Sequence, residues 1–353
     1  MRITIYLRAL TLSALVSFIS FACFAEEHFT PDHLASTYLD SAESLIQKAL
    51  NSDHGFERLA EMCDRFGPRF SGSATLEQAI DWALEEMKKD GFSKVRGEPV
   101  MVPRWVRGKE SLSITSPLKK SCRMLGLGGS VGTGPDGIVA EVLVVQSFEE
   151  LKANQVQAKG KIVLFNAPFT DYGATVVFRV RGAIEAAKAG AVASLIRSVG
   201  PFSMQTPHTG MMVYDDAVPR IPHAAITLED AMLLERMQER GDLLKVELHM
   251  EAQNMEPSLS RNVVAEIPGL ESPEEIVLIS GHIDSWDVGQ GAMDDGGGCL
   301  AMWEAARLIL KAGLRPRRTI RVVLWTNEEN GMAGVRTYRD QHKEALEHHV
   351  LAI

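Results

Sequence analysis

The sequence predicts an α/β protein with a mixed, mostly parallel sheet that has helices on both faces, and with a second α/β block inserted into it. Nearly continuous apolar segments of strand length, at residues 274–281 and 319–326, are separated by an amphipathic segment of helical length at 299–313. Strands of this kind are typical of parallel sheets that are covered on both faces. A separate pattern of strands and helices between residues 120 and 253 predicts the inserted block.

The first 25 residues have the features of a secretory signal peptide. Arg2 and Arg8 precede an apolar run from Ala9 to Phe24, and Ala25 is a small residue at the expected cleavage site. This order of positive, apolar and small residues is the pattern of a cleaved signal. The run is shorter than the roughly 20 residues that a membrane span needs, so an uncleaved anchor is the weaker interpretation. We expect no membrane span once the signal is removed.

Charge and cysteine content exclude several classes of protein. The formal net charge is -9, and removal of the two arginines in the signal would make it -11. Acidic chains are poor binders of nucleic acid and of anionic membranes, so we expect no nucleic-acid partner. Outside the signal only Cys63, Cys122 and Cys299 remain, which allow at most one disulfide. The chain is therefore not expected to be a disulfide scaffold, despite its secretory signal.

Three helices and a pair of strands are expected before the inserted block. Residues 32–51 and 53–67 have apolar side chains at helical spacing, and Asp53 is a candidate N-cap for the second of these helices. The clearest helical pattern lies at residues 76–91. Residues 94–114 then alternate between apolar and polar side chains, as strands do.

The inserted block has enough elements to form a core of its own. We expect a loop at 126–137, strands at 138–145 and 160–166, a helix that leads into a strand at 180–198, and a polar stretch at 247–262 that ends the block. The block at 120–253 would then separate two parts of one domain, at 46–119 and 254–353.

Acidic side chains follow two of the predicted strands. His282 and Asp284 come just after one strand. Glu328 and Glu329 come just after another. Ligands collect at the carboxyl ends of parallel strands, so we expect these side chains to lie close together. Asp294 precedes a run of glycines and a predicted helix, and carboxylates are favoured at helix N-termini.

A histidine and several carboxylates without thiolates suit zinc. Two zinc ions, about 3.5–4 Å apart, would need a bridging carboxylate. His282 would bind one ion, Glu329 the other, and Asp294 would bridge them. Asp284 is placed to accept the second N–H of His282 and so fix its tautomer. Glu328 suits a general base that activates water for attack on a peptide carbonyl.

Each part of this set also has an ordinary structural interpretation. A histidine at a strand end, a turn with a helix cap, and a solvated pair of glutamates are all common features. If there were no metal site, all three of these ordinary features would have to occur together by coincidence, in this order and at the ends of these elements. A metal site is therefore the favoured interpretation.

The segments GHIDSWDVGQGAMDDGGG (281–298) and VLWTNEENG (323–331) resemble the core of the secreted co-catalytic zinc peptidases, the family of bacterial aminopeptidases and glutamate carboxypeptidases. The resemblance extends to GPRFSGS (67–73) and VPRWVRG (102–108). The insert at 120–253 resembles a protease-associated domain. The resemblance implies a zinc exopeptidase-like fold with the ligand and base roles given above.

The resemblance also implies properties that composition and spacing do not show. These are a propeptide near residues 26–45, a homodimer, two zinc ions per subunit, and hydrolysis of small peptides, mainly dipeptides with free termini. The expected location is the secretory pathway (endoplasmic reticulum and Golgi), the lysosome and the extracellular space.

The family has two further zinc ligands, an aspartate beyond the Glu328-Glu329 pair and a histidine near the end of the chain. We expect the C-terminal part of the catalytic domain to be missing, because the sequence ends at Ile353 and its tail, at 340–353, has the pattern of a starting helix. The histidines of that tail are expected on the helix surface. This leaves open an alternative, a truncated and catalytically inactive binding or regulatory form of the same fold.

Overall fold

The computed structural model describes residues 31–353 and divides into two compact units. The first unit ends at Gln47 and the second runs from Lys48 to Ile353. Helix α1 (Pro31–Leu50) begins in the first unit. The predicted signal peptide lies outside the described residues. Among the described helices, none is long and apolar enough to cross a membrane.

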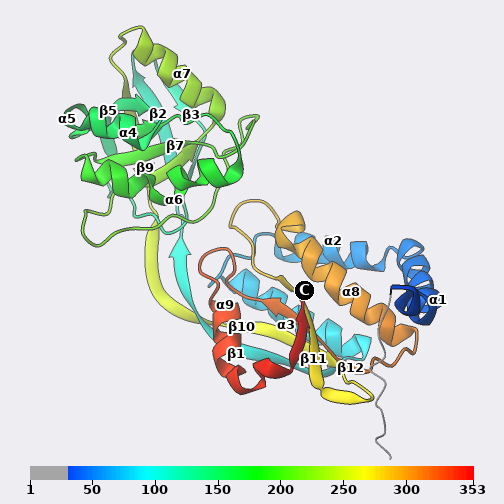
Figure 1. Ribbon diagram of the computed structural model, residues 1–353. Coiled ribbons are helices and arrows are strands. Elements are labelled where there is room, and N and C mark those ends of the chain that lie inside the picture. The colour runs from blue at the N-terminus through cyan, green and yellow to red at the C-terminus, as the bar shows by residue number, and fades with distance from the viewer. Residues whose placement is uncertain (1–30) are drawn as a thin grey trace, which may run out of the picture. The chain divides into compact units, whose positions relative to one another are not determined.

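The second unit contains a mixed five-stranded sheet with the strand order β1-β10-β12-β11-β13 (Figure 1). Its strands are β1 (Ser93–Val106), β10 (Gln253–Ile267), β11 (Ser272–His282), β12 (Arg318–Trp325) and β13 (His349–Ala352). β11 is parallel to β12 and to β13, whereas β10 is antiparallel to β1 and to β12. The sheet is mixed, as predicted, but it is not mostly parallel, because two of its four strand pairings are antiparallel. The chain leaves this sheet along β1 and returns to it along β10, and these two strands are antiparallel. The βαβ pattern on which the prediction rests does not include such a pair.

Helices cover both faces of this sheet, as the sequence predicts. α2 (His54–Phe66), α3 (Ala74–Asp90) and α8 (Gly297–Lys311) share one apolar core with β10 and β12, and α9 (Ala333–Gln341) packs on the opposite face. The alternation of a strand explains the two cores, because Val263 and Ala265 of β10 point to the first face and Val264 points to the second. Ser73 begins α3 as a side-chain cap, and Gly91, with φ 97°, ends it.

An eight-stranded sheet lies between β1 and β10 in the chain, with the order β3-β2-β9-β5-β6-β7-β8-β4. Its strands are β2 (Glu110–Ser116), β3 (Lys120–Cys122), β4 (Met124–Gly126), β5 (Ile138–Val145), β6 (Ile162–Phe165), β7 (Ala193–Arg197), β8 (His223–Ile226) and β9 (Lys245–Met250). Its helices are α4 (Phe148–Ala153), α5 (Gln155–Ala158), α6 (Tyr172–Lys188) and α7 (Leu228–Glu239). Two apolar clusters pack around this sheet. The sheet starts at Glu110, ahead of the boundary that we expected at residue 120.

The polar stretch at 247–262 forms strands rather than a loop. It contains the end of β9 and the first half of β10, where Gln253 pairs with Val106 and Leu259 pairs with Met101 of β1. Residues 253–257 are exposed. This part of β10 forms a two-stranded ribbon with β1 that no helix covers. Neither face of the ribbon has to be apolar, so the sequence does not alternate between apolar and polar residues there.

The C-terminal tail differs from the expected helix. α9 ends at Gln341, a short 3₁₀ segment, η2 (Lys343–His348), follows, and β13 then pairs with β11. Backbone hydrogen bonds join Ile353 to Leu278 (2.9 Å) and Ser280 (3.0 Å). His349 is not on a helix surface, because its Nε2 lies 2.9 Å from the hydroxyl of Tyr338. The pairing with β11 is a long-range contact that local periodicity does not reveal.

Candidate metal centre

The predicted site residues lie at one edge of the five-stranded sheet. β11 and β12 are parallel neighbours with His282 opposite Trp325, which confirms the expected strand arrangement. The loop with Glu328 and Glu329 therefore starts beside the histidine. The short π-helical turn η1 (Ala292–Gly296), which precedes α8, brings Asp294 to the same edge.

Three potential ligands converge at this edge. One ligand atom from each of His282, Asp294 and Glu329 lies within 4.8 Å of the others. Nε2 of His282 is 3.1 Å from Oδ1 of Asp294 and 3.8 Å from Oε2 of Glu328. In the described part of the chain, His282 is the ion-pair partner of Asp294 and Glu328, and no Lys or Arg side chain takes that place. One nitrogen donor and two carboxylates without a balancing cation fit a divalent metal ion.

Asp284 has a different set of contacts from the one predicted. The backbone carbonyl of Asp284, at 3.0 Å, accepts a hydrogen bond from Nδ1 of His282, and its carboxylate lies farther away, at 3.8 Å. The carboxylate accepts hydrogen bonds from the backbone N–H groups of Glu328 (3.0 Å) and Glu329 (3.2 Å). His282 thus presents Nε2 to the ligand cluster, and the Asp284 side chain holds the glutamate loop.

Burial and crowding of carboxylates raise several pKa values in the site. Burial, together with the charge of Asp294, raises the pKa of Glu329 to about 7. Burial raises the pKa of Asp284 to about 6, although its two backbone hydrogen bonds oppose this shift. Burial lowers the pKa of His282, but the surrounding carboxylates outweigh it and the net pKa is raised. A bound cation would stabilise the charged carboxylates that this environment disfavours.

Asp295 fixes the chain on both sides of the ligand cluster. Its carboxylate accepts hydrogen bonds from the backbone N–H of His282 (3.0 Å) and of Gly298 (3.2 Å). A Cβ atom at Gly281 would lie 2.7 Å from this carboxylate, and one at Gly298 would lie 2.1 Å from it. The glycines on either side of the aspartates therefore make room for the Asp295 side chain.

Arg69 holds the loop between His282 and Asp294 through hydrogen bonds to its backbone. Its side chain is fully buried and donates hydrogen bonds to four backbone carbonyls, of Gly67, Ile283, Gln290 and Gly291, at 2.7–3.0 Å. In the sequence, GPRFSGS (67–73) stands out only through its resemblance to the family, and nothing in it predicts a role for Arg69. The local sequence around Arg69 carries no sign that three of its four partners lie 214 to 222 residues away.

The ligand cluster opens into a pocket of about 540 Å³. Its lining combines the five-stranded sheet region with the eight-stranded one: Tyr172, Arg179, His208, Thr209, Gly210, Met211, His282, Trp286, Asp294, Glu328, Glu329, Gly331 and Met332. The sequence does not predict that any residue of the region 120–253 lies at the site. Tyr172, Arg179 and His208 are therefore additions that only the structure supplies.

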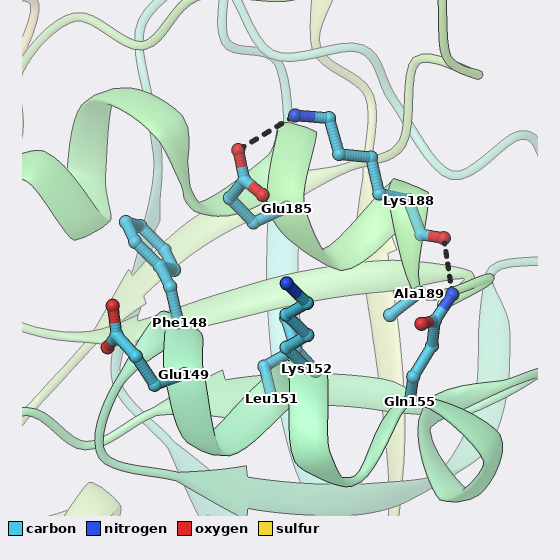
Figure 2. Close-up of a pocket in the computed structure, with 8 residues that line it drawn as sticks. All are labelled: Phe148, Glu149, Leu151, Lys152, Gln155, Glu185, Lys188 and Ala189. Atoms are coloured by element: carbon cyan, nitrogen blue, oxygen red, sulfur yellow. Dashed lines mark hydrogen bonds and ion pairs between the residues drawn. The ribbon is translucent and has the colours of Figure 1, made fainter.

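A second pocket lies between α4, α5 and α6 (Figure 2). Two of its charged side chains, Lys188 and Glu185, form an ion pair (3.0 Å), and the backbone carbonyl of Lys188 accepts a hydrogen bond from Gln155 (Figure 2). None of the predicted site residues lines it. The pocket at the ligand cluster is therefore the candidate functional site.

Known proteins share both the sequence and the fold. Residues 262–352 match the profile of peptidase family M28. Carboxypeptidase Q of Xenopus laevis is 52% identical over 314 residues, which cover 88% of this chain and 67% of that protein. Carboxypeptidase Q of Homo sapiens is 49% identical over 317 residues, covering 89% of this chain and 67% of the human protein. The chain thus spans about two thirds of the length of these curated relatives.

Solved structures agree with this grouping. A peptidase M28 precursor from Shewanella amazonensis SB2B matches with a TM-score of 0.86 and 38% identity, over 90% of this chain and 73% of that one. BSAP, a zinc aminopeptidase from Bacillus subtilis, has the same fold, with a TM-score of 0.66 at 22% identity over 85% of this chain and 68% of its own. The fold and the sequence together define a peptidase. The chain belongs to peptidase family M28.

Proposed function

We propose that the chain is a zinc-dependent exopeptidase that hydrolyses small peptides, mainly dipeptides with free termini. The observation that carries the proposal is the convergence of His282, Asp294 and Glu329 within 4.8 Å, beside Glu328 and in the lining of one pocket. Histidine and carboxylate ligands with an accessible side are typical of catalytic zinc sites. The carboxypeptidase Q relatives favour carboxypeptidase or dipeptidase action.

In this proposal His282, Asp294 and Glu329 would hold zinc, with His282 and Glu329 as terminal ligands and Asp294 as the ligand shared by two ions. The chemistry that bound zinc would supply is a lower pKa of water and polarisation of the peptide carbonyl. Glu328 is the general base, which removes a proton from the attacking water and delivers it to the leaving amine. Its position in the pocket lining, 3.8 Å from Nε2 of His282, supports this role. Asp284 acts by holding the backbone of the glutamate loop.

Several finer properties belong to the same proposal. We infer a homodimer in the secretory pathway, lysosome or extracellular space, with a signal peptide at 1–25, a propeptide at 26–45 and a protease-associated insert at 120–253. The order of charged, apolar and small residues at the N-terminus supports secretion. The separate eight-stranded sheet supports an insert. Neither the site nor the comparisons favour the alternative of an inactive binding form.

The proposal is tested by zinc content and turnover in the same preparation. After loosely held metal is removed, elemental analysis should find two zinc ions per chain, and dipeptide hydrolysis should stop on chelation and return with zinc. Glu328→Gln should keep the zinc and lose about 10²–10⁴-fold in kcat, the usual contribution of a general base. Glu239→Gln, an exposed residue of α7, is the matched control and should behave as wild type.

Zinc far below one ion per chain in the wild type would contradict the proposal. If Glu328→Gln lost its zinc together with its activity, Glu328 would be a ligand and not the base.

A further inference from the structure

His208 comes from the eight-stranded region and faces the same pocket as the candidate ligands. It lies in the segment between β7 and β8 and lines the pocket with His282, Asp294 and Glu328. Part of the residue surface is exposed, so a molecule in the pocket can reach it, although the ring also packs against Tyr172. The roles proposed above leave this histidine unused.

The position of the His208 ring is well defined. Its backbone N–H donates a hydrogen bond to Oγ of Ser198 (2.6 Å). Its ring packs edge-on against Tyr172, with 6.2 Å between the ring centroids and an angle of 77°. The first contact fixes the backbone of His208, and the second supports the ring at the pocket wall.

Arg179 determines which ring nitrogen carries the proton. Nη1 of Arg179 lies 3.4 Å from Nδ1 of His208, and its main acceptor is the carbonyl of Thr209 at 3.1 Å. A guanidinium can only donate, so Nδ1 of His208 must accept. In the neutral ring the proton is then on Nε2, the nitrogen that Arg179 does not occupy.

The electrostatic surroundings keep this ring neutral near pH 7. Burial lowers the pKa of His208 below its ordinary value, and the nearby charge of Arg179 lowers it further, while the charge of Asp294 opposes both effects. Arg179 itself is only 9% exposed, and among the described residues no carboxylate forms an ion pair with it. A neutral imidazole that is fixed in this way offers one hydrogen-bond donor to the pocket.

We propose that His208 is a substrate-contacting residue whose Nε2–H donates a hydrogen bond to an oxygen of the bound peptide, and that Arg179 is the positioning residue that fixes its tautomer. The inference rests on the proposed function, because it takes a small peptide as the occupant of the pocket. A neutral donor selects an acceptor oxygen and gives nothing to an ammonium group. The ligand cluster and His208 would then hold the peptide from two regions of the chain.

Binding is measured without turnover in the Glu328→Gln background, by calorimetric titration with alanyl-alanine. His208→Ala should weaken binding about 3–10-fold, the usual net effect of one hydrogen bond, and should leave the zinc content unchanged. His208→Gln keeps a side-chain N–H donor and should recover most of the affinity. His249→Ala, in β9 and outside the pocket lining, is the matched control.

In the active enzyme, His208→Ala should raise KM by a similar factor with a smaller change in kcat. The same variants are compared on alanyl-alanine and on alanyl-alaninamide. An equal loss on both assigns an uncharged carbonyl oxygen as the acceptor, and a loss on the free acid alone assigns the terminal carboxylate. Either result supports the contact.

Unchanged affinity in His208→Ala would overturn the inference and leave the proposed function intact. A loss that His208→Gln does not recover, accompanied by lower thermal stability, would show a merely structural role and would overturn it too. Conversely, dipeptide binding that depends on His208 without any hydrolysis by the wild type would contradict the proposed function alone.

The role of Arg179 has a spectroscopic test. Nitrogen-15 NMR of the wild type should show His208 as the Nε2–H tautomer. Arg179→Gln should give a mixture of both tautomers, because a glutamine side chain can donate to the ring or accept from it. The Nδ1–H tautomer in the wild type would overturn the assignment of Arg179.

Discussion

The carboxylate of Asp284 accepts a hydrogen bond from the backbone N–H of Glu328 at 3.0 Å, and a second from Glu329 at 3.2 Å. Asp284 follows β11, and the two glutamates follow β12. A single buried side chain therefore joins the ends of two neighbouring parallel strands. The candidate base and one candidate ligand depend on the same carboxylate for the position of their backbone.

Asp284→Asn should reduce kcat/KM and zinc affinity by about 10–100-fold, the effect that is usual for residues that support metal ligands. Asparagine keeps the size of the side chain, but its NH₂ group cannot accept, so one of the two backbone N–H groups loses its partner. Steady-state kinetics and zinc titration provide the measurement. Asp216→Asn is the control, since the Asp216 side chain is 90% exposed. Values within twofold of wild type would show that Asp284 does not hold the loop.

His223 makes the stability of the eight-stranded region dependent on pH. The ring is fully buried, and burial lowers its pKa to about 4, although hydrogen bonds to backbone carbonyls oppose this. The unfolded chain has the ordinary value near 6.5, so it binds the proton first as the pH falls. The free energy of unfolding should therefore decrease from about pH 6.5 downward, and the decrease should be complete near pH 4, at roughly 3 kcal/mol.

Urea unfolding of the wild type and of His223→Gln at pH 8, 6, 5 and 4 measures this contribution. The glutamine variant lacks the titrating group, so its stability should fall less steeply between pH 6.5 and 4. The quantity to compare is the slope of the free energy of unfolding against pH. A loss of stability that is the same at every pH does not change this slope. Parallel curves for the two proteins would exclude His223 as the source of the pH dependence.

The strands and helices near the ligand cluster can be predicted from the sequence, because each of them shows its buried face in the spacing of its own apolar residues. β11, β12 and α8 carry apolar side chains at the spacing of buried elements, and the parallel pairing of β11 with β12 places His282 beside the glutamate loop. The polar ribbon in β10 and the edge strand β13 were not predicted, since neither has a covered face. Both are held by backbone hydrogen bonds to strands that are distant in the sequence, and a local pattern of side chains does not reveal such bonds.

The supporting residues of the site escape prediction for a related reason. Asp295 holds the His282 backbone, but its neighbour Asp294 has the same chemistry in the sequence, and only the three-dimensional register separates their roles. His208 is distant in sequence from every other candidate residue. Its position at the pocket depends on how the loop after β7 folds.

Arg107 and Asp287 form a bidentate ion pair, with nitrogen–oxygen distances of 2.6 and 2.7 Å, that joins the chain before β2 to the loop between His282 and Asp294. Arg107 also donates to Oγ1 of Thr209 in the pocket lining. Arg107→Met and Asp287→Asn should each destabilise the protein by roughly 1–3 kcal/mol, since each removes the charge-assisted hydrogen bonds of this pair. The double variant should lose less than the sum of the two. Additive losses in urea unfolding would show that the pair is not coupled.

Arg69→Lys should cost about 1–3 kcal/mol of stability, although it keeps the charge. The guanidinium donates to four backbone carbonyls in fixed directions, and burial lowers its pKa, so the fold already bears the cost of a desolvated cation. A lysine has three donors on a shorter head group and must leave at least one buried carbonyl without a partner. Two of these carbonyls, of Gln290 and Gly291, precede Asp294, so zinc affinity should fall together with stability. Urea unfolding and zinc titration measure both effects against Arg65→Lys, an exposed control on α2. A loss below about 1 kcal/mol would mean that the loop keeps its shape without the guanidinium, and Asp294 would then depend on η1 alone for its position.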